Sequence, residues 1–310
     1  MRRHLSMLVA GTAAAVIGVL VAASSAQVNA GPSDAAARSV NLLSADPNAI
    51  AQSPAIGPLP DAPPDVAIGL DLRAKEVASA AAQDGADISF TLLDRKTGKV
   101  LTGGDDVPFP VASVSKLFIA DDLLMQVAKG QRQLTPDEQQ SFDVMLRSSD
   151  DSAAEVFWGE GGGNAIISRV TARYGLSSTS APYDGNWWNT MSTTADLVRY
   201  YDMLLDGTGG LPASQAAVIL GDLSASTPTG VDGYPQRFGI PDGLFAETVA
   251  VKQGWMCCWN GGNWLHMSTG VIGSDHRFVL AMASLQPVDD ATARSTMTKA
   301  VKTMFPGGRI

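Results

Sequence analysis

The sequence predicts a single α+β domain, in which strands from both ends of the chain form one sheet and a block of helices is inserted between them. Two observations predict this fold class. Segments with strand-like composition occur at 88–102 and again at 249–284, whereas the stretch between them has mainly helical patterns. The 310 residues are 45% hydrophobic, which is enough for one large domain with a buried core. We expect a site where the sheet edge meets the helical block.

The first 30 residues have the pattern of a secretory signal peptide. A positive leader, Arg2-Arg3-His4, precedes an uncharged apolar run from Leu5 to Ala23. Small residues follow, with Ser24-Ser25-Ala26 or Val28-Asn29-Ala30 as candidate cleavage sites. Because the run approaches the ~20 residues that span a bilayer, an uncleaved anchor is the alternative, with membrane association through it. Both interpretations place the folded part outside the cytoplasm, secreted or in the cell envelope.

Residues 31–66 are rich in proline, alanine, serine and asparagine, a composition that predicts a disordered tether. The folded domain is therefore expected over 67–310, with a helical subdomain at about 112–245. No cysteine lies near the end of the apolar run, so we expect no lipid attachment there.

The elements of the domain follow, in chain order, from periodicity, caps and turn residues. An alanine-rich helix is expected at 71–83, and a hairpin at 88–102 turns at Lys96-Thr97-Gly98-Lys99. The apolar-periodic stretch 114–127 predicts a long helix, and Thr135 followed by Pro136 predicts the start of the next. The remaining expectations are helices at 153–158, 164–174, 194–205 and 291–304, loops at 207–213 and 230–243, and strands at 249–254, 265–272 and 277–284.

Charge and cysteine content exclude some functions and leave one question open. The formal net charge is −9 and no basic cluster is present, which argues against nucleic acid as a partner. Export permits a disulfide between Cys257 and Cys258, but adjacent Cα atoms lie only ~3.8 Å apart, so a bridge would be strained and both states stay open. With His266 and His276 as the histidines outside the signal, no metal site or other cofactor is expected. We expect a monomer.

Three short stretches carry the residue types of one active site: Ser113-Val114-Ser115-Lys116, Ser149-Asp150-Asp151 and Lys252-Gln253-Gly254. Serine and lysine three residues apart at a helix start share one face, and a neutral lysine can take the serine proton. Burial and a second nearby cation both lower a lysine pKa, and Lys252 would supply that cation. Taken singly, the stretches are also compatible with a chance helical pattern, a helix cap and a solvated strand edge.

An oxyanion site is also expected at this helix start. Backbone N–H groups near Ser113 point at it with the positive end of the helix dipole, and the N–H of Trp255 could face them.

The stretch from Ile88 to Phe305 resembles the class A serine β-lactamases and the related penicillin-binding D,D-peptidases, in particular exported β-lactamase-like lipoproteins of mycobacteria. The sequence segments that carry this resemblance are Val111–Ile119, Met145–Ala154, Thr193–Leu197 and Val251–Gly254. The resemblance implies a five-stranded antiparallel sheet flanked by helices, plus an all-helical subdomain. It also implies residue roles: the acylated nucleophile is Ser113, its base Lys116, the proton relay Ser149, and the lysine that helps hold a substrate carboxylate Lys252.

Three departures from that family pattern affect the expected chemistry. Asp151 stands where the family has asparagine, and a carboxylate accepts hydrogen bonds but donates none. Gln253 replaces a threonine or serine. From Gly161 to Ala195 there is no glutamate to activate a deacylating water, and Asp184 is the only acid. Efficient β-lactam hydrolysis is therefore not expected.

The expected substrate contacts come from the second and third stretches and from the strand that follows: Asp151, Gln253, Gly254, Trp255 and His266, the last as a candidate for the family's carboxylate-binding arginine. The pair Trp187-Trp188 could stack on a sugar, but we expect it to pack within its loop.

The favoured function is an active-site-serine hydrolase that acts on a cell-wall peptide or a β-lactam-like amide through an acyl-enzyme. Turnover would be slow because the deacylating glutamate is absent. The alternative is a non-catalytic exported protein that retains the fold and binds cell-wall fragments or an envelope partner. A different serine acyl hydrolase, such as an esterase, is a third interpretation.

Overall fold

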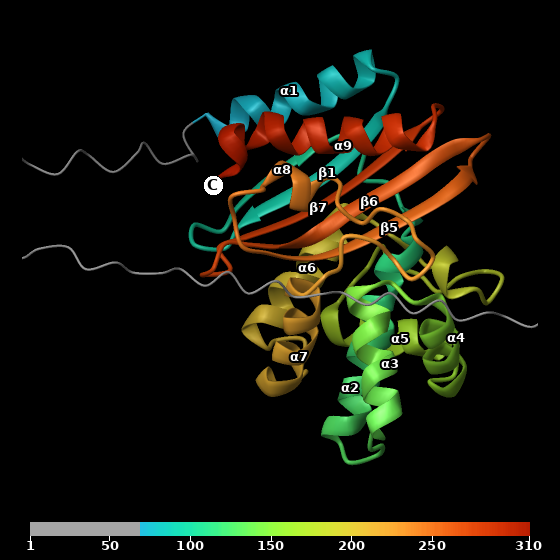
Figure 1. The fold of residues 1–310 in the computed structure, drawn as a ribbon. Coiled ribbons are helices and arrows are strands. Elements are labelled where there is room, and N and C mark those ends of the chain that lie inside the picture. The colour runs from blue at the N-terminus through green and yellow to red at the C-terminus, as the bar shows by residue number, and fades with distance from the viewer. Residues whose placement is uncertain (1–68) are drawn as a thin grey trace, which may run out of the picture. The chain divides into compact units, whose positions relative to one another are not determined.

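A computed structural model describes residues 69–310, and the predicted signal and tether lie outside the described residues. The α+β fold is confirmed (Figure 1). A five-stranded antiparallel sheet has the order β2-β1-β7-β6-β5. Its strands are β1 (Asp87–Asp94), β2 (Lys99–Gly103), β5 (Val249–Trp259), β6 (Asn263–Ile272) and β7 (Phe278–Gln286). The sheet therefore combines the two ends of the domain, as predicted.

Two long helices, α1 (Leu70–Gln83) and α9 (Asp290–Met304), cover one face of the sheet, with the short α8 (Ile240–Gly243) beside them (Figure 1). The strand period of two decides which side chains meet these helices. On β7, Phe278, Leu280 and Met282 belong to the core beneath α1 and α9.

The helical part covers the opposite face, where the alternate β7 residues Val279, Ala281 and Ala283 join a second core. It contains η1 (Ala112–Ser115), α2 (Lys116–Ala128), α3 (Pro136–Arg147), α4 (Asp151–Glu160), α5 (Asn164–Tyr174), η2 (Trp187–Asn189), α6 (Thr194–Asp206) and α7 (Ala213–Ser224). A small second sheet pairs β3 (Phe109–Pro110) with β4 (Met191–Ser192), and η3 (Pro306–Gly308) ends the chain.

Buried ion pairs fix α5 against α2, the helix that follows the predicted nucleophile. Asp122 accepts two hydrogen bonds of 2.7 Å from the guanidinium of Arg169. Asp121, fully buried one position earlier, pairs with Arg173 and accepts from the Tyr174 hydroxyl at 2.5 Å. A buried carboxylate is tolerated only when it is paired in this way. Asp121 and Asp122, which lie within the apolar stretch 114–127, thus hold in place the helix that carries Lys116.

The structure departs from the sequence prediction in a few places. Helix α7 was not predicted: it begins after Pro212, with no side-chain cap. Strand β5 continues beyond the predicted Gly254 to Trp259, and the pairing with β6 becomes irregular between Met256 and Trp259. Among residues 69–310, no helix is long and apolar enough to span a membrane.

The irregular end of β5 carries the two cysteines. Cys257 and Cys258 are joined by a disulfide, which settles the question that the sequence left open. Cys258 has a φ of 72°, a backbone conformation unusual for residues other than glycine.

Candidate active site

Ser113 lies in η1 at the junction between the sheet and the helical part, and its side chain is nearly buried. The preceding residue, Ala112, has a φ of 46°, which few residues with a side chain adopt. The Ser115 hydroxyl donates to the Ala112 carbonyl at 2.7 Å and holds this turn. The strained turn directs the Ser113 hydroxyl toward Lys116, whose Nζ lies 2.8 Å from Ser113 Oγ. The predicted contact within one helical turn is present.

Lys116 is fully buried and its amine is surrounded by oxygen atoms. Besides Ser113, Nζ contacts the Ser149 carbonyl at 2.8 Å, the Ser149 hydroxyl at 3.1 Å and Asp151 Oδ1 at 2.5 Å. The Trp187 ring closes the remaining side, with its centroid 4.6 Å from Nζ. An ammonium has three donors, so these four oxygens compete for its protons.

Lys252 approaches the same hydroxyl from β5. Its Nζ lies 2.9 Å from Ser149 Oγ and 3.1 Å from the Gln253 carbonyl, and its side chain is buried. Ser149 has a φ of 56°, the second left-handed residue of the site that is not glycine. Its hydroxyl therefore joins two amines that come from distant parts of the chain.

The two amines do not have the same electrostatic environment. Burial lowers the pKa of Lys116, and the carboxylate of Asp151 opposes that shift. Burial also holds the pKa of Lys252 well below its usual range, and the charge of Lys116 lowers it further. Burial therefore disfavours the charged form of both amines, and at Lys116 the carboxylate of Asp151 offsets part of that effect.

Gly254 lets β5 approach the nucleophile turn. A Cβ at this position would lie 2.8 Å from the Val111 carbonyl oxygen and 3.2 Å from Val114 Cγ2. Only glycine fits this approach without a shift of the backbone. The strand therefore passes against η1 at the residue before Trp255, whose N–H as an oxyanion donor stays a prediction.

Three of the residues expected to contact substrate have side chains that point away from the site. Strand alternation turns Lys252 and Gly254 toward η1, so Gln253 and Trp255 point to the opposite face of the sheet. Gln253 Nε2 donates to the backbone carbonyls of Gln236 at 3.2 Å and Phe238 at 2.5 Å. The Gln253 side chain is therefore not placed to contact substrate as expected, whereas the N–H expected of Trp255 belongs to the backbone and stays a prediction.

His266 is the third displaced side chain, directly across from Trp255 in the β5–β6 register. It is fully buried, and its Nε2 lies 2.7 Å from the Tyr234 hydroxyl and 3.1 Å from Asp290 Oδ1. Burial lowers its pKa to about 4. His266 is thus a neutral structural histidine and not a substitute for a carboxylate-binding arginine. The short distance to Asp290 is therefore not an ion pair, because burial keeps the His266 ring uncharged.

Trp187 of η2 lies against the amine cluster, whereas the loop before η2 contributes no acid to it. Asp184 accepts from the Asn186 backbone and side chain and from Asn189 Nδ2, which stabilises the turn. Trp187 is buried, packs edge-to-face on Trp188 and lies against Lys116. The expected packing role is confirmed for Trp187, whereas its contact with the base was not foreseen.

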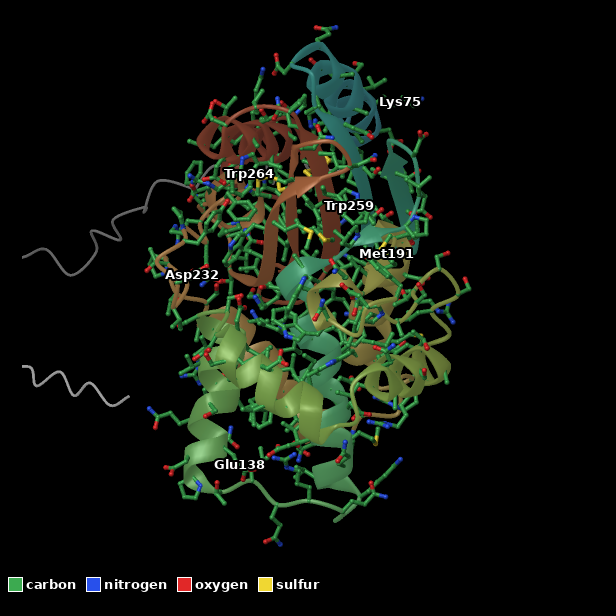
Figure 2. The ribbon with its side chains drawn as sticks, turned by 90° about the vertical axis from the view of Figure 1, so that its right-hand side faces the viewer. Lys75, Glu138, Met191, Asp232, Trp259 and Trp264 are labelled. Carbon is green, nitrogen blue, oxygen red and sulfur yellow. A yellow bond between two sulfur atoms is a disulfide. The ribbon has the colours of Figure 1, made fainter. Side chains whose placement is uncertain are left out.

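A second residue that the sequence did not indicate is Asp232, in the loop 225–239. This loop is tied to the end of α3, since Val231 N donates to the Ser148 carbonyl at 2.8 Å. The charge of Asp232 raises the pKa of both Lys116 and Lys252, although burial outweighs it. In Figure 2, Asp232 at the left and Met191 at the right both lie near the level where the sheet meets the helices.

This arrangement of hydroxyls and amines contains the groups needed to activate a serine. Within residues 69–310, no cluster of histidine, cysteine and acidic residues could hold a metal ion. The site instead offers a hydroxyl next to a buried amine, and a second hydroxyl that links this amine to another one. Such a group of residues can transfer a proton from the serine to a leaving group.

Comparison with known proteins agrees with this geometry. A family model described as the Beta-lactamase enzyme family matches residues 72–144. A relative from Mycobacterium tuberculosis, named "Putative lipoprotein LppW", is 59% identical over 252 residues, covering 81% of this chain and 80% of the relative.

Solved structures share the fold at low sequence identity. PBP-A has a TM-score of 0.62 at 18% identity, with 76% of this chain and 94% of that chain covered. The TLA-3 extended-spectrum β-lactamase has a TM-score of 0.63 at 13% identity, with 76% and 98% covered. The chain shares the fold of PBP-A and of the TLA-3 β-lactamase, and it belongs to the family of the mycobacterial putative lipoprotein LppW.

Proposed function

We propose that this protein is a serine acyl hydrolase or transferase that forms an acyl-enzyme at Ser113 with a cell-wall peptide or a β-lactam-like amide. The observation that carries this proposal is the contact of 2.8 Å between Lys116 Nζ and Ser113 Oγ, at a buried amine whose pKa burial lowers. A neutral Lys116 accepts the Ser113 proton while Oγ attacks the carbonyl carbon. Ser149, in contact with both amines, relays a proton to the leaving group.

The acyl-enzyme is expected to persist. Residues 161–195 contain no glutamate, and the one acid there, Asp184, is held by Asn186 and Asn189. Without a positioned base, the deacylating water loses the 10²–10⁴-fold or so that general-base catalysis typically contributes. The protein would therefore be labelled by penicillin-like compounds more readily than it would destroy them.

We propose an extracytoplasmic location. The relative is named a lipoprotein, and the N-terminal pattern of this chain is that of an export signal or an uncleaved anchor. The two cysteines of the sequence, at 257 and 258, are joined to each other, so neither is available for lipid attachment. Attachment to the membrane, where it occurs, would use the apolar segment itself.

One observation favours the non-catalytic alternative. The carboxylate of Asp151 lies 2.5 Å from Lys116 Nζ and raises the pKa of the proposed base. A permanently protonated Lys116 could not activate Ser113, and the fold would then serve to bind wall fragments or an envelope partner.

Covalent labelling distinguishes the two functions. Purified protein is incubated with a fluorescent penicillin and, separately, with a fluorophosphonate, and the label is located by mass spectrometry. We expect label on Ser113 that is absent in Ser113→Ala and retained in Ser152→Ala, a control at an exposed serine of α4. Absence of label from both probes, with a normal circular dichroism spectrum and a cooperative thermal transition, would support the binding protein.

A further inference from the structure

The ion pair between Asp151 and Lys116 is asymmetric. The Lys116 side chain is fully buried, whereas the Asp151 side chain is 71% exposed. Within residues 69–310, Lys116 is the one side chain or backbone group bonded to the Asp151 carboxylate. A solvated carboxylate at the first turn of α4 can rotate away at little cost, whereas the buried amine cannot follow it.

The charged groups that face Lys116 make the entrance of the site acidic. Asp150 and Asp151 come from the start of α4, and Asp232 from the loop 225–239; all three raise the pKa of Lys116. Lys252 faces it from β5, but burial and Lys116 disfavour its positive charge. From η2 comes Trp187, which carries no charge. Lys252 contacts a hydroxyl and a carbonyl rather than an acid, but burial disfavours the positive charge that would attract a substrate carboxylate.

Resting on the proposed function, we propose that Asp151 determines specificity: it binds a cationic amino group of the acyl donor and in doing so frees Lys116 to act as the base. The ammonium of the donor replaces Lys116 as the partner of the exposed carboxylate. Lys116 then remains buried without a counterion, and its pKa falls because the group that opposed desolvation has left.

The steps balance in protons and electrons. Lys116 first releases its extra proton to water. The Ser113 Oγ–H bond then breaks as Oγ bonds to the carbonyl carbon, and the proton passes to the lone pair of Lys116 Nζ. The carbonyl π electrons move to oxygen and return as the bond to the leaving group breaks. The proton on Nζ passes through Ser149 to the leaving group.

The test uses three thioester acyl donors that are identical except for one side group: a primary amine, its acetamide, and its succinamide, which carries a carboxylate. The rate constant for acylation of Ser113 is measured for each by intact-protein mass spectrometry. We expect the amine donor to react about fivefold faster than the acetamide, as one solvated ion pair allows, and the carboxylate donor to be slowest.

Asp151→Asn is the decisive variant. It removes the charge but keeps the size, so the amine and acetamide donors should react at equal rates. The acetamide donor should react faster than with the unchanged protein, because Lys116 is less protonated. Asp137→Asn, an exposed acid in the first turn of α3, should leave all three rates unchanged.

The experiment distinguishes failure of the specificity proposal from failure of the proposed function. Equal rates for the three donors in the unchanged protein, or a preference for the amine that survives in Asp151→Asn, would overturn the specificity proposal while acylation stands. No acylation of Ser113 by any donor or by the fluorophosphonate would overturn the proposed function and this inference with it. Thermal melting of Asp151→Asn shows whether a changed rate reflects folding, and Asp151→Ser repeats the test with a smaller neutral side chain.

Discussion

Replacement of Gly254 by alanine should damage the site without touching any of its polar groups. The added Cβ would lie 2.8 Å from the Val111 carbonyl oxygen, closer than such contacts occur in proteins, and 3.2 Å from Val114 Cγ2. Both neighbours belong to the turn that positions Ser113, so β5 or η1 must move by several tenths of an ångström. Overpacking of this kind costs about 1–3 kcal/mol of the free energy of unfolding. A misplaced nucleophile should also lower the rate of Ser113 acylation by roughly tenfold or more.

The assay combines urea denaturation with acylation by a fluorophosphonate, and the matched control is Gly221→Ala. Gly221 lies inside α7, where an added Cβ meets nothing within 4 Å. There, alanine should stabilise the protein by roughly 0.5–1 kcal/mol and leave acylation unchanged. If Gly254→Ala were as stable and as reactive as the unchanged protein, β5 would not press on the nucleophile turn, and the site geometry derived above would be wrong.

Three further predictions concern titratable groups. In Lys116→Ala, acylation of Ser113 at pH 7 should fall by at least about 10²-fold while the thermal midpoint changes little; retained acylation would exclude Lys116 as the base. The acylation rate of the unchanged protein should rise with pH as Lys116 loses its proton, and Asp151→Asn should move this midpoint to lower pH, since the carboxylate raises the pKa of Lys116. His266 is neutral in the fold, with a pKa of about 4 against 6.5 in the unfolded chain. Its contribution to the free energy of unfolding is therefore complete above pH 6.5 and is lost as the pH falls toward 4. The loss should reach about 3 kcal/mol and be absent in His266→Gln, as measured by urea denaturation at pH 7, 5.5 and 4.5.

Elements with local start and stop signals could be predicted from the sequence. Thr135 caps α3 in a full capping box with Glu138, and Gly175 ends α5 in a left-handed conformation. Helix α7 lacks such signals, because it follows Pro212 without a side-chain cap and includes a glycine. It is stabilised by burial of Ile219 and Leu223 in the helical core, a tertiary effect that no local signal announces.

The site shows the same division between local and long-range information. The pairing of Ser113 with Lys116 depends on a single helical turn and was predictable. The contact of Lys252 with Ser149 joins residues 103 positions apart, and no local signal predicted it. It was expected from the three stretches taken together and from the family resemblance. The error at Gln253 was avoidable: once Lys252 faces the nucleophile, the period of a strand turns its neighbours away. The positions of Asp232 and Trp187 near the amines could not be predicted from local sequence. They depend on packing of their segments against Ser148 and Lys116, which lie far away along the chain.

One side chain decides between the two functions that the fold allows. Ser113, Lys116 and Ser149 are in contact in both cases, since they form a hydrogen-bonded network inside a braced core. On the proposal above, Lys116 keeps its proton while Asp151 remains on it, and Ser113 is then an ordinary hydroxyl. If a ligand draws the carboxylate away, desolvation of the same lysine makes it a base. Because only the Asp151 side of the pair is exposed, its state would depend on which ligand reaches that carboxylate. On this proposal, the protein reacts faster with acyl donors that carry a positive charge than with those that do not.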